Sequence, residues 1–224
     1  MKQSFWLTLI FSLGYLVLAL ACLFAWEASN PWGHLDRYSG GYLFLRWVAS
    51  LHSLISSRKV FRSKRVMREW WALDSDPAGP SWVMALMVSD LLVFLAYGRW
   101  HPLRVLEQPG FQGAGLGLYS VVIVWQAWTD SYLANYFERE ESLPLPMNQG
   151  PFRFIRHPRY AAAILGKVAF ALVFASAIAW LLAAAWMYLL IRKISIEEAH
   201  LRTVFGPTYE AYSRKTARVL PGIY

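Results

Sequence analysis

The chain contains very little cysteine and little charge. Its 224 residues include one cysteine, Cys22, which lies within an apolar run. An intrachain disulfide and a cysteine metal site are therefore excluded. Charged residues make up 16% of the chain, whereas soluble domains carry about 25%. The sequence shows no internal repeat, and its length suits one domain of several short helices rather than a transporter built from repeated halves.

Apolar and aromatic residues replace the missing charge. The chain is 57% hydrophobic and 17% aromatic, and its mean hydropathy is positive. This composition predicts an integral membrane protein. The formal charge of +8 would also suit nucleic acid. The basic residues, however, lie largely at the ends of apolar segments, which indicates contact with membrane lipids and no nucleic-acid partner.

Four apolar segments are long enough to be predicted spans, at residues 5–26, 41–56, 81–97 and 113–135. We interpret the first as a retained span, because it is long for a signal core and no small-x-small cleavage site follows. The densest basic cluster lies between Arg58 and Arg68 and should be cytoplasmic. Crossings counted from a cytoplasmic N-terminus put 57–80 and 136–159 inside. The segments 27–40 and 98–112 then lie outside.

Residues 160–191 are too long for one comfortable span and too short for two complete ones. One long tilted helix and a hairpin of two short helices both remain possible. We favour a hairpin that turns near Ala175-Ser176, because Arg192-Lys193 and the basic tail are typical of a cytoplasmic end. The tail, 194–224, is predicted to form an amphipathic helix that ends at Gly206-Pro207, followed by a second short helix.

The predicted fold is an all-α integral membrane protein, with four spans, a C-terminal helical hairpin and amphipathic tail helices. Both termini are expected in the cytoplasm, and the expected location is a prokaryotic inner membrane. The polar residues that flank the hairpin suggest chemistry. Arg156-His157-Pro158-Arg159-Tyr160 precede it and Glu197-Glu198 follow it, while Ala161–Ile191 contains one charge, Lys167. A hairpin would bring these two polar groups together on one side of the bilayer.

The order of these motifs resembles the isoprenylcysteine carboxyl methyltransferases and their prokaryotic membrane relatives. The resemblance covers 148–224 and starts with Gly150-Pro151-Phe152-Arg153-Phe154-Ile155-Arg156-His157-Pro158-Arg159-Tyr160. It continues after the hairpin with Glu197-Glu198-x-x-Leu201, Phe205-Gly206, Tyr209, Tyr212 and Arg218-x-Leu220-Pro221. It implies one membrane domain over 1–224, with variable spans at 1–145 and a cofactor-binding core at 146–224. Ala162, Phe152 and Phe154 depart from the residues common in that family.

The resemblance implies S-adenosylmethionine as methyl donor and a lipophilic small molecule or lipid as acceptor. Glu197 or Glu198 would accept hydrogen bonds from the ribose diol or the ammonium group. The other residues expected at the cofactor are Gly150, Pro151, His157, Pro158 and Tyr160. Arg156 or Arg202 would orient an acceptor carboxylate, and together with Glu198 they form the expected catalytic group. No metal is expected.

Plainer explanations exist for each of these residues. Arg159, and less readily Arg156, would serve as positive-inside anchors, and His157 as a helix cap. The Glu pair would suit a solvated helix face, and since adjacent helical residues point about 100° apart, only one Glu is expected to face the site. Tyr209 and Tyr212 are interpreted as packing residues.

Three charges within predicted spans, Arg46, Asp90 and Lys167, require partners. Asp90 would pair with either base, the charges would snorkel to the interface, or they would take part in an acceptor tunnel. Trp125 and Trp128 would line such a tunnel, or serve as part of the bundle interior or an interface belt.

Two other functions compete with methyl transfer. Sterol and steroid reductases share an Arg-His-Pro-x-Tyr run and use NADPH, but this chain is too short for ten spans and lacks a basic cluster for a 2′-phosphate. A non-catalytic membrane scaffold is the third possibility. The sequence leaves the acceptor open among a carboxylate, an amine, a thiol and a hydroxyl.

Overall fold

The computed structural model describes residues 13, 17, 37–60, 89, 93, 105–139 and 149–221. Within them every regular element is helical. The predicted spans 5–26 and 81–97 lie outside the described residues, apart from Leu13, Val17, Ser89 and Val93, and Asp90 lies outside as well. The elements are α2 (Arg37–Val60), α5 (Pro109–Arg139), η2 (Gly150–Arg153), α6 (Pro158–Phe174) and α7 (Ala177–Lys215).

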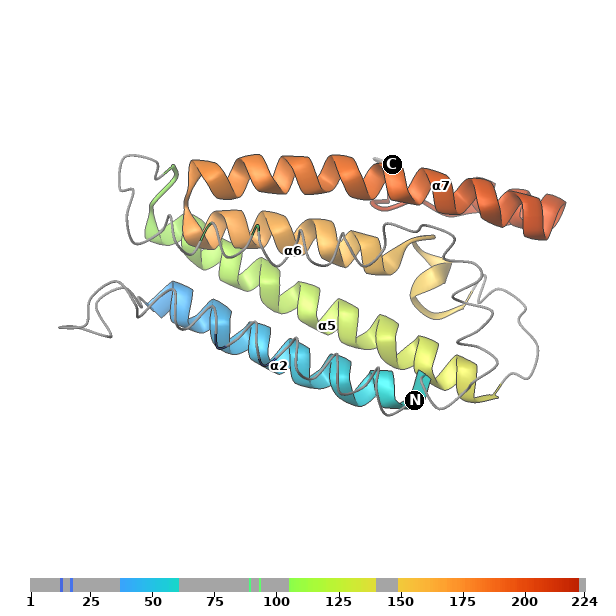
Figure 1. The fold of residues 1–224 in the computed structure, drawn as a ribbon, viewed down its shortest axis with the longest axis horizontal. Helices are drawn as coiled ribbons and strands as arrows, with labels where there is room; N and C mark the ends of the chain where they lie inside the picture. The colour runs from blue at the N-terminus through green and yellow to red at the C-terminus, as the bar shows by residue number, and fades with distance from the viewer. Residues whose placement is uncertain are drawn as a thin grey trace.

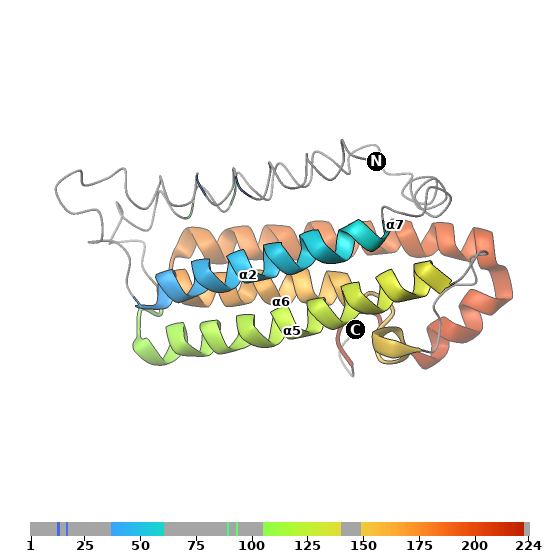
Figure 2. The same cartoon turned by 90° about the horizontal axis from the view of Figure 1, so that it is seen from below.

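The helices α2 and α5 contain the predicted segments 41–56 and 113–135, and each extends beyond them at both ends. The four long helices lie side by side along their lengths (Figures 1 and 2). In Figure 1, α2 and α5 run in one direction, α6 runs back, and α7 returns in the direction of α5. This places the end of α5, the start of α6 and the polar end of α7 at the same end of the bundle.

The predicted hairpin is confirmed as a reversal of the chain, and the single long helix is excluded. Helix α6 ends at Phe174, where Ala175 takes a left-handed conformation with φ 46° and its N–H donates to the carbonyl of Ala171. Ser176 is extended and α7 begins at Ala177. The 17 residues of α6 rise about 25 Å at 1.5 Å per residue, somewhat less than a hydrocarbon core of about 30 Å.

Aromatic side chains fill the centre of the bundle. Tyr42 of α2 lies 4.4 Å from Tyr119 of α5 and 5.4 Å from Phe170 of α6, measured between ring centroids. Glycine lets the backbones come close here, since a Cβ on Gly115 would lie 2.7 Å from Cβ of Leu172. The core is therefore built from side chains of α2, α5, α6 and α7, together with Val93.

Two of the three predicted intramembrane charges lie inside this bundle. The Arg46 Nη1 atom is 3.5 Å from the hydroxyl of Tyr119. The Lys167 ammonium lies over the rings of Phe170 and Trp186, at 5.5 and 5.7 Å from their centroids. Such cation–π contacts stabilise a cation in an apolar setting. These two bases therefore contact aromatic side chains.

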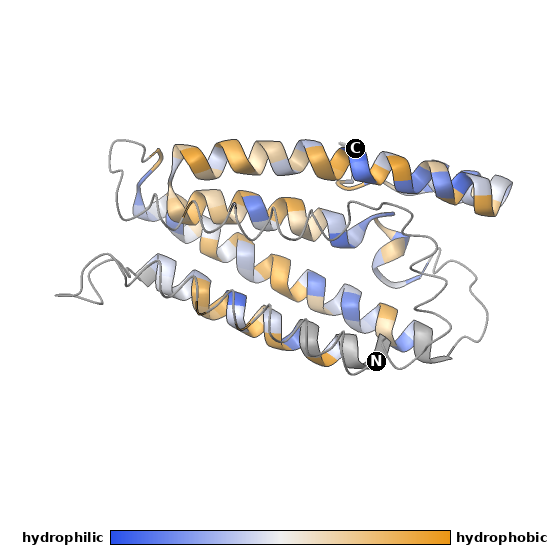
Figure 3. Ribbon diagram, in the orientation of Figure 1, coloured by the Kyte–Doolittle hydropathy of each residue, from blue (hydrophilic) through white to orange (hydrophobic). Residues whose placement is uncertain are grey.

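Helix α7 carries the change from apolar to polar character (Figure 3). Among the described helices it is long and apolar enough to cross a membrane. The amphipathic tail helix expected to start at residue 194 is no separate element, because α7 continues through this point without a break. The backbone becomes non-helical at Gly206, with φ 51° and ψ −130° before Pro207, where the sequence predicted a break. The chain then bends back toward η2 (Figure 2).

Candidate functional site

The loop before α6 depends on a glycine and two prolines. Gly150 has φ 54°, a left-handed conformation, and a Cβ there would lie 2.6 Å from the ring of Tyr132. Pro151 is buried in the first turn of η2, and Pro158 starts α6. A fixed φ near −65° suits both proline positions. Gly150 is thus required by the packing of η2 on α5, whatever it contributes to a ligand.

The C-terminal tail is bound to this loop through the backbone. Ile155 and Ala217 form a parallel β-bridge. The N–H of Arg156 donates to the carbonyl of Ala217 at 2.8 Å, and the N–H of His157 donates to that of Arg218 at 3.1 Å. The sequence did not predict this pairing, because a single bridge has no periodic pattern. Because of this pairing, Arg218 lies beside the start of α6.

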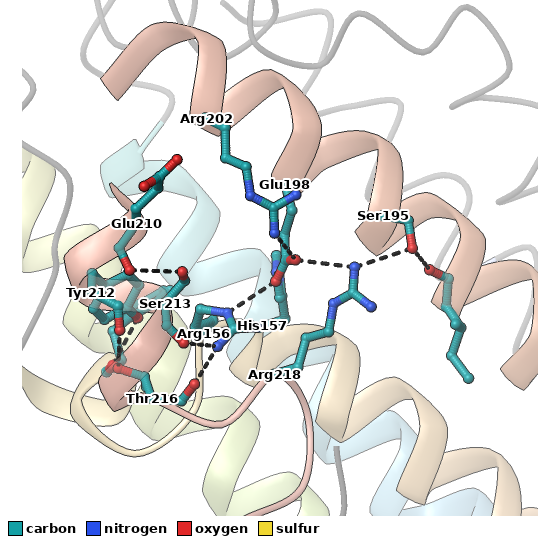
Figure 4. A network of polar contacts seen from close by, with 12 residues as sticks. Arg156, His157, Ser195, Glu198, Arg202, Glu210, Tyr212, Ser213, Thr216 and Arg218 are labelled. Atoms are coloured by element: carbon teal, nitrogen blue, oxygen red, sulfur yellow. Dashed lines mark hydrogen bonds and ion pairs between the residues drawn. The ribbon is translucent and has the colours of Figure 1, made fainter. Parts of the chain in front are cut away.

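Glu198 is the centre of a polar cluster (Figure 4). Its Oε1 accepts hydrogen bonds from Arg156 Nε at 2.9 Å and from His157 Nε2 at 3.1 Å. Its Oε2 lies 3.0 Å from Arg218 Nη2 and 3.5 Å from Arg202 Nη2. Glu198 is 1% exposed. The interpretation of Glu198 as part of a solvated helix face is therefore wrong.

The cluster keeps Glu198 ionised. This residue lies in the polar part of α7, beyond the apolar stretch. Burial alone would raise the pKa of Glu198, but the hydrogen bonds from His157 and Arg156 and the positive charge of Arg156 outweigh burial and lower the pKa to about 2. Glu198 is thus a buried carboxylate that is stabilised by its partners.

Arg156 connects three parts of the chain. Besides its contact with Glu198, its Nη1 donates to the backbone carbonyls of Ser213, at 2.6 Å, and Thr216. The side chain is 12% exposed. These bonds fix the loop, α7 and the tail to one another, which a positive-inside anchor at the lipid surface would not do.

Arg202 and Arg159 differ in setting. Arg202 is half exposed and reaches Glu198 from one helical turn further along α7. Arg159 lies 3.3 Å from the buried carboxylate of Asp130, so it pairs with α5 and does not join the Glu198 cluster. Of the two, Arg202 is the arginine that combines contact with the cluster and access to a ligand.

The remaining predicted residues gather around the same cluster. His157 occupies the N-cap position of α6 but makes no side-chain capping bond, so its imidazole is committed to Glu198 instead. The ring of Tyr160 packs at 5.7 Å from that of His157. Within the described part of the chain, no three His, Cys, Asp or Glu side chains are placed to hold a metal ion.

Two buried polar atoms beside the cluster lack a hydrogen-bond partner among the described residues. They are Glu197 Oε2 and Tyr209 Oη. Buried polar atoms are normally paired, so each of these has room for a bond to a ligand or to water. Such atoms fit the polar groups of S-adenosylmethionine, which offers donors and acceptors. The sequence interpretation of Tyr209 as a packing residue missed this, because exposure and bonding are not visible in the sequence.

The two tyrosines after the kink differ in bonding. The hydroxyl of Tyr212 donates to the carbonyl of Phe152 at 2.8 Å, whereas that of Tyr209 has no such partner among the described residues. Burial, and after it the negative charge of Glu198, raise the pKa of Tyr209. Its hydroxyl is therefore neutral and can donate a hydrogen bond.

An apolar groove of about 440 Å³ lies on α5, lined by Ser120, Val121, Val124, Trp125 and Trp128. It is connected to the loop before α6. The indole of Trp125 donates to the carbonyl of Pro158 at 3.1 Å, and the ring of Trp128 lies 6.4 Å from that of Phe154. Two of the side chains that line the groove therefore contact the loop before α6 and the first residue of that helix.

The comparison with protein families agrees with this arrangement. A family model described as phospholipid methyltransferase matches residues 110–208. Over this segment, the chain is similar to the phospholipid methyltransferase family. The resemblance to isoprenylcysteine carboxyl methyltransferases is confirmed at this level, since the family includes them. The comparisons with curated proteins and with solved structures give no match.

The phospholipid methyltransferase segment runs from the start of α5 through η2 and α6 into α7. It contains the groove, the loop and Glu198, and it stops just before Tyr209. The match indicates a membrane methyltransferase and gives no support to the reductase alternative.

Proposed function

We propose that this protein transfers a methyl group from S-adenosylmethionine to a lipophilic acceptor at the cytoplasmic face of a membrane. The observation that carries the proposal is the convergence of the Arg156-His157-Pro158 loop on Glu198, beside two buried polar atoms that have no described partner. The family of residues 110–208 supports it.

When bound, S-adenosylmethionine would supply a methyl group on a sulfonium, which passes to the attacking nucleophile while S-adenosylhomocysteine leaves with the electron pair of the broken C–S bond. The chain's own residues bind and orient. Glu197 Oε2 accepts a hydrogen bond from the ammonium group or the ribose diol, and the backbone around Gly150 and Pro151 meets the remaining polar atoms. Glu198, already paired with four side chains, acts mainly as a positioning residue that holds the loop and α7 in register. Of the two glutamates expected to contact the cofactor, we therefore assign the direct contact to Glu197.

Arg202 orients the acceptor in this proposal. It is half exposed, whereas Arg156 uses Nε and Nη1 for protein partners. A guanidinium binds a carboxylate through paired N–H donors. An anionic acceptor would need no general base, so the rate would depend on alignment of nucleophile and methyl carbon and on exclusion of water.

The acceptor is proposed to arrive from the bilayer. The groove on α5 is almost entirely apolar and reaches Pro158 and Phe154 through its two tryptophans. A hydrocarbon tail lying there would place its polar head near the loop. Apolar surface buried in this way contributes about 0.8 kcal/mol per methylene.

Binding of S-adenosylhomocysteine and of NADPH to the purified protein tests the proposal by calorimetry. Binding of S-adenosylhomocysteine alone supports a methyltransferase, and binding of NADPH alone supports a reductase. Binding of neither supports a non-catalytic scaffold. Incubation of lipid extracts with radiolabelled methyl donor would then identify the acceptor fraction that takes up label. The Glu197→Gln variant should bind S-adenosylhomocysteine more weakly by about 1–3 kcal/mol, and Glu210→Gln is the control on the exposed face of the same helix.

A further inference from the structure

Tyr209 and Tyr212 lie three residues apart after the kink at Gly206, and both are buried. Their rings pack with centroids 6.1 Å apart. The hydroxyl of Tyr212 is used inside the protein, at the carbonyl of Phe152. Tyr209 is 1% exposed, and its hydroxyl has no hydrogen-bond partner among the residues that the structure describes. A donor in this position is costly unless a ligand or water satisfies it.

The charges around Tyr209 define what it would bind. Three guanidinium groups, those of Arg156, Arg202 and Arg218, lie around a single carboxylate, Glu198. Glu198 has its oxygens occupied by these side chains and by His157. Even with the neighbouring carboxylate of Glu197 counted, three guanidinium groups face two carboxylates, and the remaining positive charge favours an anionic ligand group close by.

We propose that Tyr209 is a ligand-contacting residue whose hydroxyl donates a hydrogen bond to a carboxylate of the bound reactants. This inference rests on the proposed methyltransferase function. It goes beyond the matched family segment, which ends at residue 208. A carboxylate can come from two sources, the methionine moiety of the methyl donor or the acceptor. In both cases the phenol supplies a neutral donor next to the guanidinium groups, which together form a carboxylate site.

Calorimetry on the full-length protein separates the two sources. The first pair of probes is S-adenosylhomocysteine and its decarboxylated analogue. The second pair is N-acetyl-S-farnesylcysteine and its carboxamide, measured in the presence of S-adenosylhomocysteine. Tyr209→Phe removes the hydroxyl alone. Tyr212→Phe removes the same group from the neighbouring ring and is the matched control.

For one of the two pairs, the wild type should bind the carboxylate at least about tenfold more tightly than the analogue without it, as a charge-assisted hydrogen bond predicts. Tyr209→Phe should reduce this ratio to near one, while Tyr212→Phe should leave it unchanged. Tyr209→Phe should also unfold at a temperature no lower than the wild type. Tyr212→Phe should unfold at a lower temperature, because it loses the bond to Phe152.

Equal carboxylate preference in the wild type and Tyr209→Phe, for both pairs, would overturn the inference and indicate a hydroxyl bonded to water. The proposed function would survive that result, since S-adenosylhomocysteine would still bind. A wild type that binds no S-adenosylhomocysteine would instead remove the proposed function, and the inference with it.

Discussion

Arg156 and Glu198, 42 residues apart in sequence, are joined by a hydrogen bond of 2.9 Å between Nε and Oε1. The apolar hairpin lies between them, so the bond ties the loop before the hairpin to the helix after it. Arg156 also holds the tail through Ser213 and Thr216. One side chain therefore fixes three segments that a ligand site at this end of the bundle would need.

Replacement of Glu198 by Gln should destabilise the folded protein by about 3 kcal/mol, because it leaves several buried or half-buried cations without their carboxylate. Thermal unfolding in detergent would measure the loss. The control is Glu210→Gln, whose partner Arg214 is 78% exposed, and there we expect a change of about 0.5 kcal/mol or less. Equal losses of stability in the two variants would contradict a stabilising role for the Glu198 cluster.

Stability should fall in acid because of the same carboxylate. The pKa of Glu198 is lowered by folding from an ordinary 4.5 to about 2. A depressed folded-state pKa stabilises the protein above the unfolded-state value, and this contribution is lost as the pH falls from about 5 toward 2. Unfolding measured across this range should show a loss of about 3 kcal/mol. Glu198→Gln should show a clearly flatter pH profile than the wild type.

Gly150→Ala should weaken the loop for two separable reasons. The left-handed backbone costs a non-glycine residue about 1–2 kcal/mol, and the added Cβ would lie 2.6 Å from the Tyr132 ring. The double variant with Tyr132→Ala should relieve the clash introduced at position 150 but keep the backbone cost. Gly117→Ala is the control, because a Cβ there meets nothing within 4 Å and should stabilise α5 by up to about 1 kcal/mol. The measurement is the unfolding temperature of the wild type and the three variants. We expect Gly117→Ala to unfold highest, then the wild type, then the double variant, and Gly150→Ala lowest.

The hairpin predicts which positions share a side of the membrane. In a Cys22→Ser background, cysteines placed at the exposed positions Arg153 and Lys215 should be labelled from the cytoplasm. A cysteine at Leu106, exposed near the turn of the hairpin, should be labelled from the opposite side. Labelling of 153 and 215 from different sides would contradict the topology.

Shortening the hydrocarbon tail of the acceptor should lower catalytic efficiency steeply if the groove on α5 holds that tail. The expected loss is about 0.8 kcal/mol per methylene removed, up to the length that the groove covers. A homologous series of acceptors, compared in steady-state kinetics, would measure it. Val124→Asp, in the groove, should reduce the dependence on tail length. Equal efficiency with a tail-less soluble analogue would refute a membrane-side entrance.

The sequence by itself determined the helical character of the described chain, the reversal at Ala175-Ser176 and the break at Gly206. Each depends on local chemistry: apolar runs of limited length, and a glycine followed by proline. The order of the motifs was also enough to indicate the family that residues 110–208 match.

Only the tertiary structure decided which side chains meet. Adjacent glutamates look alike in sequence, but the angle between them on α7 buries Glu198 among four partners and leaves an oxygen of Glu197 without a described one. Tyr209 and Tyr212 are equally alike, and their difference arises because the chain folds back at Gly206 and brings Phe152 to one hydroxyl and not to the other. Hydrogen bonds across 40 to 60 residues depend on how the helices pack, and local sequence patterns carry no record of that packing.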